Sequence, residues 1–170
     1  MSPQNKIWSG GLLFLAGLLC AHAELQVGDR FPSLDTGTLT GGTPPATAGR
    51  ITLVDFWASW CAPCKLAFPV YVQLHADYRA RGLVIVAVSV DENQRAFETF
   101  VKRQAPPFAT LRDQAHQLVN QVKVSAMPTC YLLDREGRVR FAHQGFHGAE
   151  TDLALRREID RLLAESPPSP

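Results

Sequence analysis

The sequence carries no marked excess of charge of either sign. Its 17 lysines and arginines nearly balance its 16 aspartates and glutamates, which leaves a net charge of +1. This balance offers no basic surface of the kind that binds nucleic acid or an anionic membrane. The 170 residues, 46% hydrophobic and 19% charged, have the size and composition of one globular domain with a substantial core.

Cysteines are few, and the sequence lacks a second group of metal-binding side chains. Two of the four cysteines, Cys61 and Cys64, stand three positions apart. A zinc site built on such a C-x-x-C pair needs a second pair of ligands. Cys130 stands alone, and the histidines at positions 75, 116, 143 and 147 are scattered. Redox chemistry of the thiol pair is therefore favoured over metal binding, and we predict neither a metal nor a bound cofactor.

No apolar run is long enough to span a membrane comfortably, but residues 1–23 have the pattern of an export signal. Lys6 precedes a short apolar stretch, residues 10–19, and small residues occupy the positions that a signal peptidase recognises. We predict cleavage after Ala23, which would remove Cys20. An uncleaved membrane anchor and a lipid-modified Cys20 are the alternatives, and membrane contact is expected only through this segment if it is retained.

Export would place the thiol pair in an oxidising compartment, where it becomes a disulfide unless a donor keeps it reduced. The mature chain would keep an odd number of cysteines. The odd one, Cys130, follows Pro128 by two residues on a predicted strand, and we expect it to point into the core as a small apolar residue. A third redox thiol is the alternative. Proteins with thiols or disulfides are the predicted partners.

The stretch from residue 54 to residue 65, V-D-F-W-A-S-W-C-A-P-C-K, joins an apolar run to the two cysteines. A strand that leads directly into a helix would place Cys61 at the helix N-terminus, where the helix dipole and free N–H groups favour a thiolate. Pro63 fits there, because the first turn of a helix does not need its N–H. Cys61 is therefore the predicted nucleophile, and Cys64 resolves the mixed disulfide from inside.

An aspartate, Asp55, lies inside the apolar run 51–57, which we predict to be a central buried strand. Burial makes the charged carboxylate costly, so its pKa should rise and it should lie near a group that uses a proton. The alternative is an aspartate that faces solvent from the end of the strand.

The same stretch resembles the active-site segment of the thioredoxin superfamily, and Ala-Ser between its two tryptophans is similar to the secreted TlpA/ResA-like branch. The resemblance extends from about Gly28 to Leu163. It implies a thioredoxin-like three-layer α/β/α sandwich with a mixed central sheet and an N-terminal hairpin extension. The domain would occupy residues 24–165, and residues 166–170 would form a disordered tail.

The resemblance also implies roles for residues around the cysteines. Asp55 precedes Cys61 by six residues, the place where thioredoxins carry a buried acid, and would exchange a proton with Cys64. Many TlpA-like proteins lack this acid, which makes the site more like that of thioredoxin. Pro128 matches the family's cis-proline, which lies beside the cysteines. The predicted substrate contacts are Trp57, Trp60, Ala62, Pro63, Met127, Pro128 and Thr129.

Apolar periodicity predicts the remaining elements of the domain. A helix interrupted by Pro69 follows the cysteines, and a strand over 83–90 leads to a helix that ends before the prolines at 106 and 107. A short strand and helix, a hairpin over 131–143 and an amphipathic closing helix complete the chain. Two β-α-β crossovers imply a sheet covered by helices.

These observations together predict a thiol-disulfide oxidoreductase outside the cytoplasm, and the branch that it resembles implies the periplasm. The TlpA/ResA resemblance favours a reductase of protein disulfides, with a role in cytochrome c biogenesis and electrons from a membrane donor. A net oxidant or an isomerase of the same fold is the alternative. A copper-handling module would resemble C-x-x-x-C with a distant histidine, and a peroxidase would need threonine where this chain has Ala58.

Overall fold

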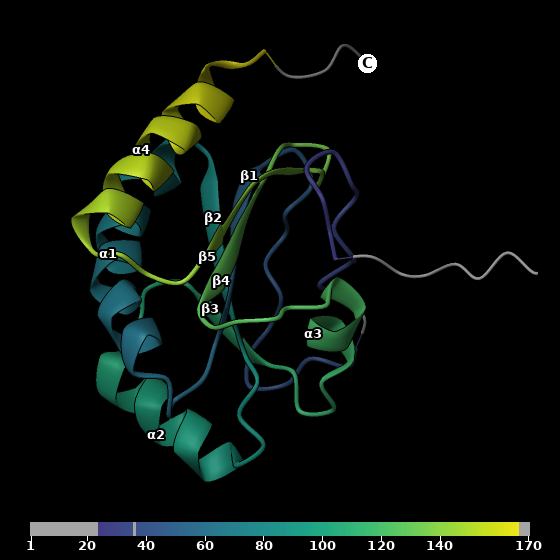
Figure 1. Cartoon of the computed structure of the whole chain (residues 1–170), viewed down its shortest axis with the longest axis vertical. Coiled ribbons are helices and arrows are strands. Elements are labelled where there is room, and N and C mark those ends of the chain that lie inside the picture. The colour runs from purple at the N-terminus through teal and green to yellow at the C-terminus, as the bar shows by residue number, and fades with distance from the viewer. Residues whose placement is uncertain (1–23, 36, 167–170) are drawn as a thin grey trace, which may run out of the picture.

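The computed structural model describes residues 24–35 and 37–166, which fold around a mixed sheet with helices on both faces (Figure 1). In this part of the chain the sheet has five strands, in the order β3-β2-β1-β4-β5. The predicted signal segment, residues 1–23, and most of the predicted tail, residues 167–170, lie outside the described residues.

The central strand of the sheet is β1, and all of its residues are buried. It pairs in parallel with β2, which pairs in parallel with β3, and on its other side it pairs antiparallel with β4, which pairs antiparallel with β5. The predicted mixed sheet and the hairpin of its last two strands are therefore confirmed. The strands are β1 (Ile51–Trp57), β2 (Leu83–Ser89), β3 (Ala109–Arg112), β4 (Thr129–Leu133) and β5 (Val139–Gln144).

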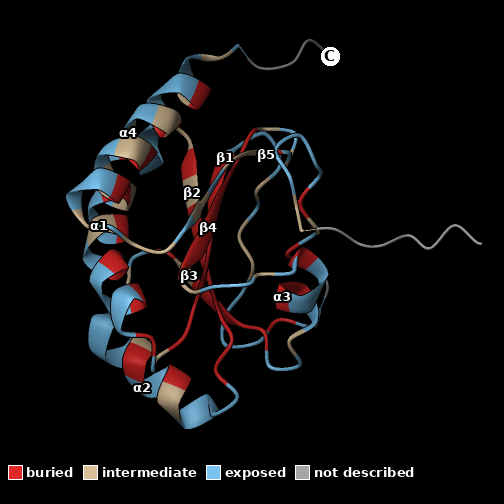
Figure 2. Cartoon of the chain, in the orientation of Figure 1, coloured by how far each residue is buried: buried red, intermediate tan, exposed pale blue. Residues whose placement is uncertain are grey.

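The helices form the two outer layers of the predicted sandwich. Three of them, α1 (Ala62–Tyr78), α2 (Gln94–Gln104) and α4 (Ala149–Ala164), cover one face of the sheet (Figure 1). The short α3 (Gln117–Val122) and the segment before β1 lie on the other face. Figure 2 shows that β1, β2, β3 and β4 are largely buried between these layers, while most of the edge strand β5 and the outer sides of the helices are not.

The segment before β1 differs from its prediction. In residues 24–35 and 37–50 we find no hairpin, only single bridges from Arg30 to Arg138 and from Thr40 to Arg112. Phe31 fixes the segment to the core, with its ring centroid 5.6 Å from that of Tyr131. The physical reason lies in its composition, because its prolines lack the N–H groups that a strand ladder requires.

Side chains of β1 alternate between the two layers, and this alternation places the site. Phe56 faces the α3 layer and meets the ring of Tyr131 edge-on at 6.3 Å. Trp57 faces the opposite layer, where its ring lies 4.9 Å from Phe68 of α1. Asp55 shares the face of Trp57, because side chains two positions apart on a strand point the same way. The acid therefore faces α1, the helix that begins at the cysteines.

Two leucines of α4 test this layering with one chemical change. Leu155 is 0% exposed and Leu153 is 60% exposed. We expect Leu155→Ala to lower the free energy of unfolding by about 2–5 kcal/mol, because it removes buried methyl groups and leaves a cavity. Leu153→Ala should change it by less than about 0.5 kcal/mol. Urea unfolding of both variants measures the difference, and equal losses would contradict this packing of α4.

Candidate active site

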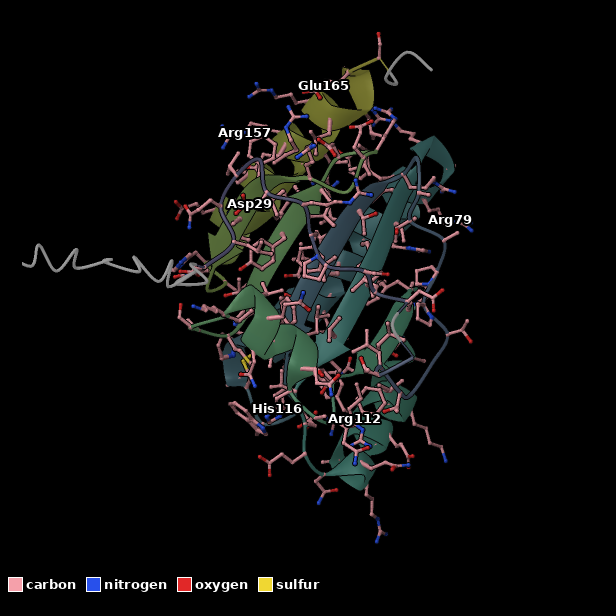
Figure 3. The ribbon with its side chains drawn as sticks, turned by 90° about the vertical axis from the view of Figure 1, so that its right-hand side faces the viewer. Asp29, Arg79, Arg112, His116, Arg157 and Glu165 are labelled. Atoms are coloured by element: carbon pink, nitrogen blue, oxygen red, sulfur yellow. A yellow bond between two sulfur atoms is a disulfide. The ribbon has the colours of Figure 1, made fainter. Side chains whose placement is uncertain are left out.

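Cys61 and Cys64 lie where β1 passes into α1, and they are joined by a disulfide (Figure 3, yellow bond). Their Cα atoms are 5.3 Å apart. Cys61 is the N-cap of α1 in extended conformation, and its sulfur accepts a hydrogen bond from the backbone N–H of Cys64 at 3.2 Å. The predicted position of Cys61 at the helix N-terminus is confirmed.

The two cysteines differ in their access to solvent. Cys61 is 6% exposed, whereas Cys64 is fully buried. Of the pair, only the Cys61 sulfur is therefore open to an incoming thiol or disulfide. The N–H groups of the first turn of α1 and the helix dipole would stabilise negative charge on this sulfur.

A surface depression of about 530 Å³ adjoins Cys61. Residues 60–63 line it, together with residues 124–127 of the loop that leads to β4. Trp60, which lines the depression, is 69% exposed. The structure thus brings together four of the seven predicted substrate contacts, Trp60, Ala62, Pro63 and Met127, and adds Val124, Ser125 and Ala126 to them.

The loop before β4 has the backbone that the family resemblance implied, since the peptide bond between Met127 and Pro128 is cis. Pro128 itself is buried, and its carbonyl accepts a hydrogen bond from the Gly145 N–H at 2.7 Å. Thr129 is also buried, and its hydroxyl donates to the Ala126 carbonyl at 2.8 Å. Pro128 and Thr129 stay predicted substrate-binding residues, although both are buried. They hold Met127 and its neighbours in place.

Trp57 is the third predicted contact that the structure places elsewhere. It is 0% exposed, and its ring lies 4.6 Å from Phe100 and 4.9 Å from Phe68. The prediction that Trp57 shapes the surface around Cys61 is wrong, because the last residue of β1 still points into the helix layer. Trp60, three residues later in the loop, is the surface tryptophan.

Asp55 is completely buried on the α1 side of β1. This excludes the solvent-facing alternative. The Tyr71 hydroxyl donates a hydrogen bond to its Oδ1 atom at 2.9 Å, and its Oδ2 atom has no hydrogen-bond partner among the described residues. Burial raises the pKa of Asp55 from 3.8 to about 8, while the hydrogen bond from Tyr71 opposes part of that rise.

Cys130 lies directly across from Asp55 in the antiparallel pairing of β1 and β4. Its side chain is buried, so the expected core position is confirmed. Burial, and secondarily the Asp55 carboxylate, raise the pKa of this thiol far above its usual range. A thiol held protonated in the core is a poor nucleophile, which disfavours the alternative of a third redox cysteine.

One residue of the site has a role that the sequence did not indicate. Asn93 caps α2 by accepting a hydrogen bond from the Ala96 N–H. The buried Asp91 carboxylate accepts hydrogen bonds from the N–H and hydroxyl of Ser59 at 2.9 and 2.8 Å. It thereby fixes the loop that carries Trp60. The serine between the two tryptophans was the available signal.

The other histidines and carboxylates of the described chain are not grouped as a metal site would require. Within residues 24–35 and 37–166, no three His, Cys, Asp or Glu side chains are close enough to hold a metal ion. His143 pairs with Glu158 of α4, with 2.7 Å between Nε2 and Oε2. In the same residues no helix is both long and apolar enough to cross a bilayer.

The raised pKa of Asp55 predicts how stability depends on pH. The unfolded chain loses this proton near pH 3.8 and the folded chain near pH 8, so folding is progressively weakened between these values. Asp55→Asn should remove this loss. The difference in the free energy of unfolding between the variant and the wild type should grow by up to about 1.4 kcal/mol per pH unit. This difference should stop growing above about pH 8.

Urea unfolding of the oxidised proteins between about pH 5 and pH 9 measures this slope. Glu92→Gln removes an exposed carboxylate and is the matched control, because it should follow the pH dependence of the wild type. Parallel curves for Asp55→Asn and the wild type would contradict the buried, protonated state of Asp55.

Comparison with known proteins agrees with this geometry. The Thioredoxin-like family model matches residues 49–139. The thiol-disulfide oxidoreductase ResA of Bacillus cereus is 27% identical over 131 residues, which are 76% of this chain and 76% of that one. ResA of Geobacillus kaustophilus is 33% identical over 114 residues, 67% of this chain and 64% of that one.

Solved structures give the same result. A Chlorobium tepidum protein described as a candidate thiol:disulfide interchange protein DsbE superimposes with a TM-score of 0.73 at 31% identity, covering 83% of this chain and 100% of that one. StoA of Bacillus subtilis superimposes with a TM-score of 0.57 at 26% identity, covering 66% of this chain and 84% of that one. The chain belongs to the thioredoxin-like family.

Proposed function

We propose that this protein reduces disulfides of other proteins outside the cytoplasm, through the dithiol form of Cys61 and Cys64. The observation that carries the proposal is the position of Cys61, the N-cap of α1 and the less buried cysteine of the pair, in the lining of a surface depression. The relatives named thiol-disulfide oxidoreductase ResA support the class of reaction.

The reaction consists of two exchange steps. The Cys61 thiolate attacks one sulfur of a substrate disulfide, which forms a mixed disulfide and releases the other substrate sulfur as a thiolate. Cys64 then loses its proton, and its thiolate attacks the Cys61 sulfur. This closes the Cys61–Cys64 disulfide and releases the second substrate sulfur. Two electrons pass from the protein to the substrate, and the oxidised protein is the form described above.

Asp55 is the proposed acceptor of the Cys64 proton. Cys64 is fully buried, so water does not reach it freely, and a nearby group must take its proton. The Oδ2 atom of Asp55 is buried without a partner, and the pKa of Asp55 near 8 allows both protonation states near neutral pH. These properties support proton exchange between the two residues.

The proposed substrate is an extended protein segment that carries the disulfide. Trp60, Pro63, Ala126 and Met127 line the depression, and these side chains are largely apolar. The Trp60 ring can cover the substrate segment next to the substrate's own cysteine. The backbone of the loop before β4 can pair with the backbone of that segment. Pro128 and Thr129 act indirectly, through the shape of this loop.

The electron donor and the cellular location are proposals from the sequence. A dithiol in an oxidising compartment needs a donor to regenerate it, and we propose a membrane reductase for this role. The export signal predicted in residues 1–23 supports a periplasmic location. Cytochrome c biogenesis remains a predicted process that such a reductase would serve.

Cysteine variants test the two exchange steps. Cys64→Ser should form a stable mixed disulfide with a disulfide-containing protein such as insulin, because Cys61 attacks and no resolving thiol follows. Cys61→Ser should form none, and Cys130→Ser should turn over like the wild type because that thiol is buried and protonated. Non-reducing electrophoresis detects the adduct. An adduct that forms through Cys64 in the Cys61→Ser variant would contradict the assigned order.

The direction of electron flow is tested by the reduction potential of the Cys61–Cys64 pair. Equilibration of the mature protein with glutathione and dithiothreitol buffers should give a value near or below about −250 mV, as expected for a reductase that waits on a donor. A value near about −120 to −150 mV would mean a net oxidant. The reductase assignment would then be wrong, although the site would stand.

A further inference from the structure

A buried polar cluster lies under the active site, on the face of the sheet that α1 covers. It consists of Asp55 on β1, Tyr71 on α1 and Cys130 on β4, none more than 2% exposed. We propose that Tyr71 is a positioning residue that holds one oxygen of Asp55 and turns the other toward proton exchange with Cys64. This inference rests on the proposed role of Asp55.

Helix geometry places Tyr71 and Cys64 on one stripe of α1. Tyr71 follows Cys64 by seven residues, which is about two helical turns, so the two side chains point in nearly the same direction. Both are buried, at 1% and 0% exposed. The helix that carries the resolving cysteine therefore also carries the hydroxyl that meets Asp55, and the spacing between the two is fixed by the helix.

The hydrogen bond distinguishes the two oxygens of the carboxyl group. The Tyr71 hydroxyl donates to Oδ1 at 2.9 Å, whereas Oδ2 is buried and finds no partner within residues 24–35 and 37–166. Buried polar atoms are normally hydrogen-bonded, and an exception needs an explanation. We explain it by function, because Oδ2 is free to exchange a proton when the disulfide opens. Without the hydroxyl, the carboxyl group could turn about its χ2 bond.

Neighbouring groups reinforce this arrangement. The Cys130 thiol stays protonated because burial raises its pKa, and the Tyr71 hydroxyl donates its proton to Asp55. β2 offers no ionisable side chain opposite Asp55, where the residue is Ala87. The ionisable groups around Asp55 are Tyr71 and Cys130 within the cluster, Cys64 of α1, and Glu158 of α4 with its partner His143.

Tyr71→Phe tests the inference, because it keeps the ring that packs near Phe68 and removes only the hydroxyl. The lost hydrogen bond stabilised the charged form of Asp55, so the pKa of Asp55 should rise by about 1–2 units above the wild-type value. A ¹³C titration of the Asp55 carboxyl in the oxidised full-length protein measures the shift. The pH at which the rate of insulin reduction is half-maximal should move upward with it.

Tyr131→Phe is the matched control. It removes a hydroxyl from another buried tyrosine, on the opposite face of the sheet beside Phe31 and Phe56, and should leave the pKa of Asp55 unchanged. An unchanged pKa in Tyr71→Phe, or an equal shift in both variants, would overturn the inference.

Asp55→Asn separates this inference from the proposed function. If it flattens the pH profile of insulin reduction while Tyr71→Phe leaves the profile in place, Asp55 handles the proton and Tyr71 does not position it. If Asp55→Asn leaves the profile unchanged, the proton role of Asp55 fails, and the role of Tyr71 fails with it.

Discussion

The direct passage of β1 into α1 is the constraint on which the site depends. β1 is buried along its whole length at the centre of the sheet, so its end is fixed by both neighbouring strands. α1 begins only a few residues later, with Cys61 as its N-cap. A reactive sulfur at a helix N-terminus therefore follows from the topology of the sheet, and the rest of the site is arranged around that one sulfur.

Two buried aspartates near this junction show how environment decides the role of a carboxylate. Asp91 accepts hydrogen bonds from Ser59 and Ser89, which together satisfy both of its oxygens. It serves as a fixed anchor for the loop before Cys61. Asp55 has a single donor and one unpartnered oxygen, and burial raises its pKa to about 8. The same side chain is thus structural in one place and able to exchange a proton in the other.

The features that depend on local sequence pattern could be predicted, whereas those that depend on packing between distant residues could not. The position of Cys61, the order of strands and helices, and the burial of Asp55 follow from apolar runs and spacing. Trp57 was misplaced because an aromatic residue beside a reactive motif suggests a surface, whereas strand alternation directs it to Phe100. Asp91 was missed because its contact with Ser59 joins residues 32 positions apart, and only the parallel pairing of β1 with β2 brings them together.

These results divide the site into two parts with different physical demands. The proposed proton exchange lies in the core, where Cys64, Asp55 and Tyr71 are shielded from water and their interactions depend on a low dielectric. The proposed substrate contact lies at the rim, where Trp60 and Met127 border the depression. Because the two parts share only Cys61, substitutions at the rim can change the preferred partner without altering the redox chemistry, and substitutions in the core can alter that chemistry without changing the partner.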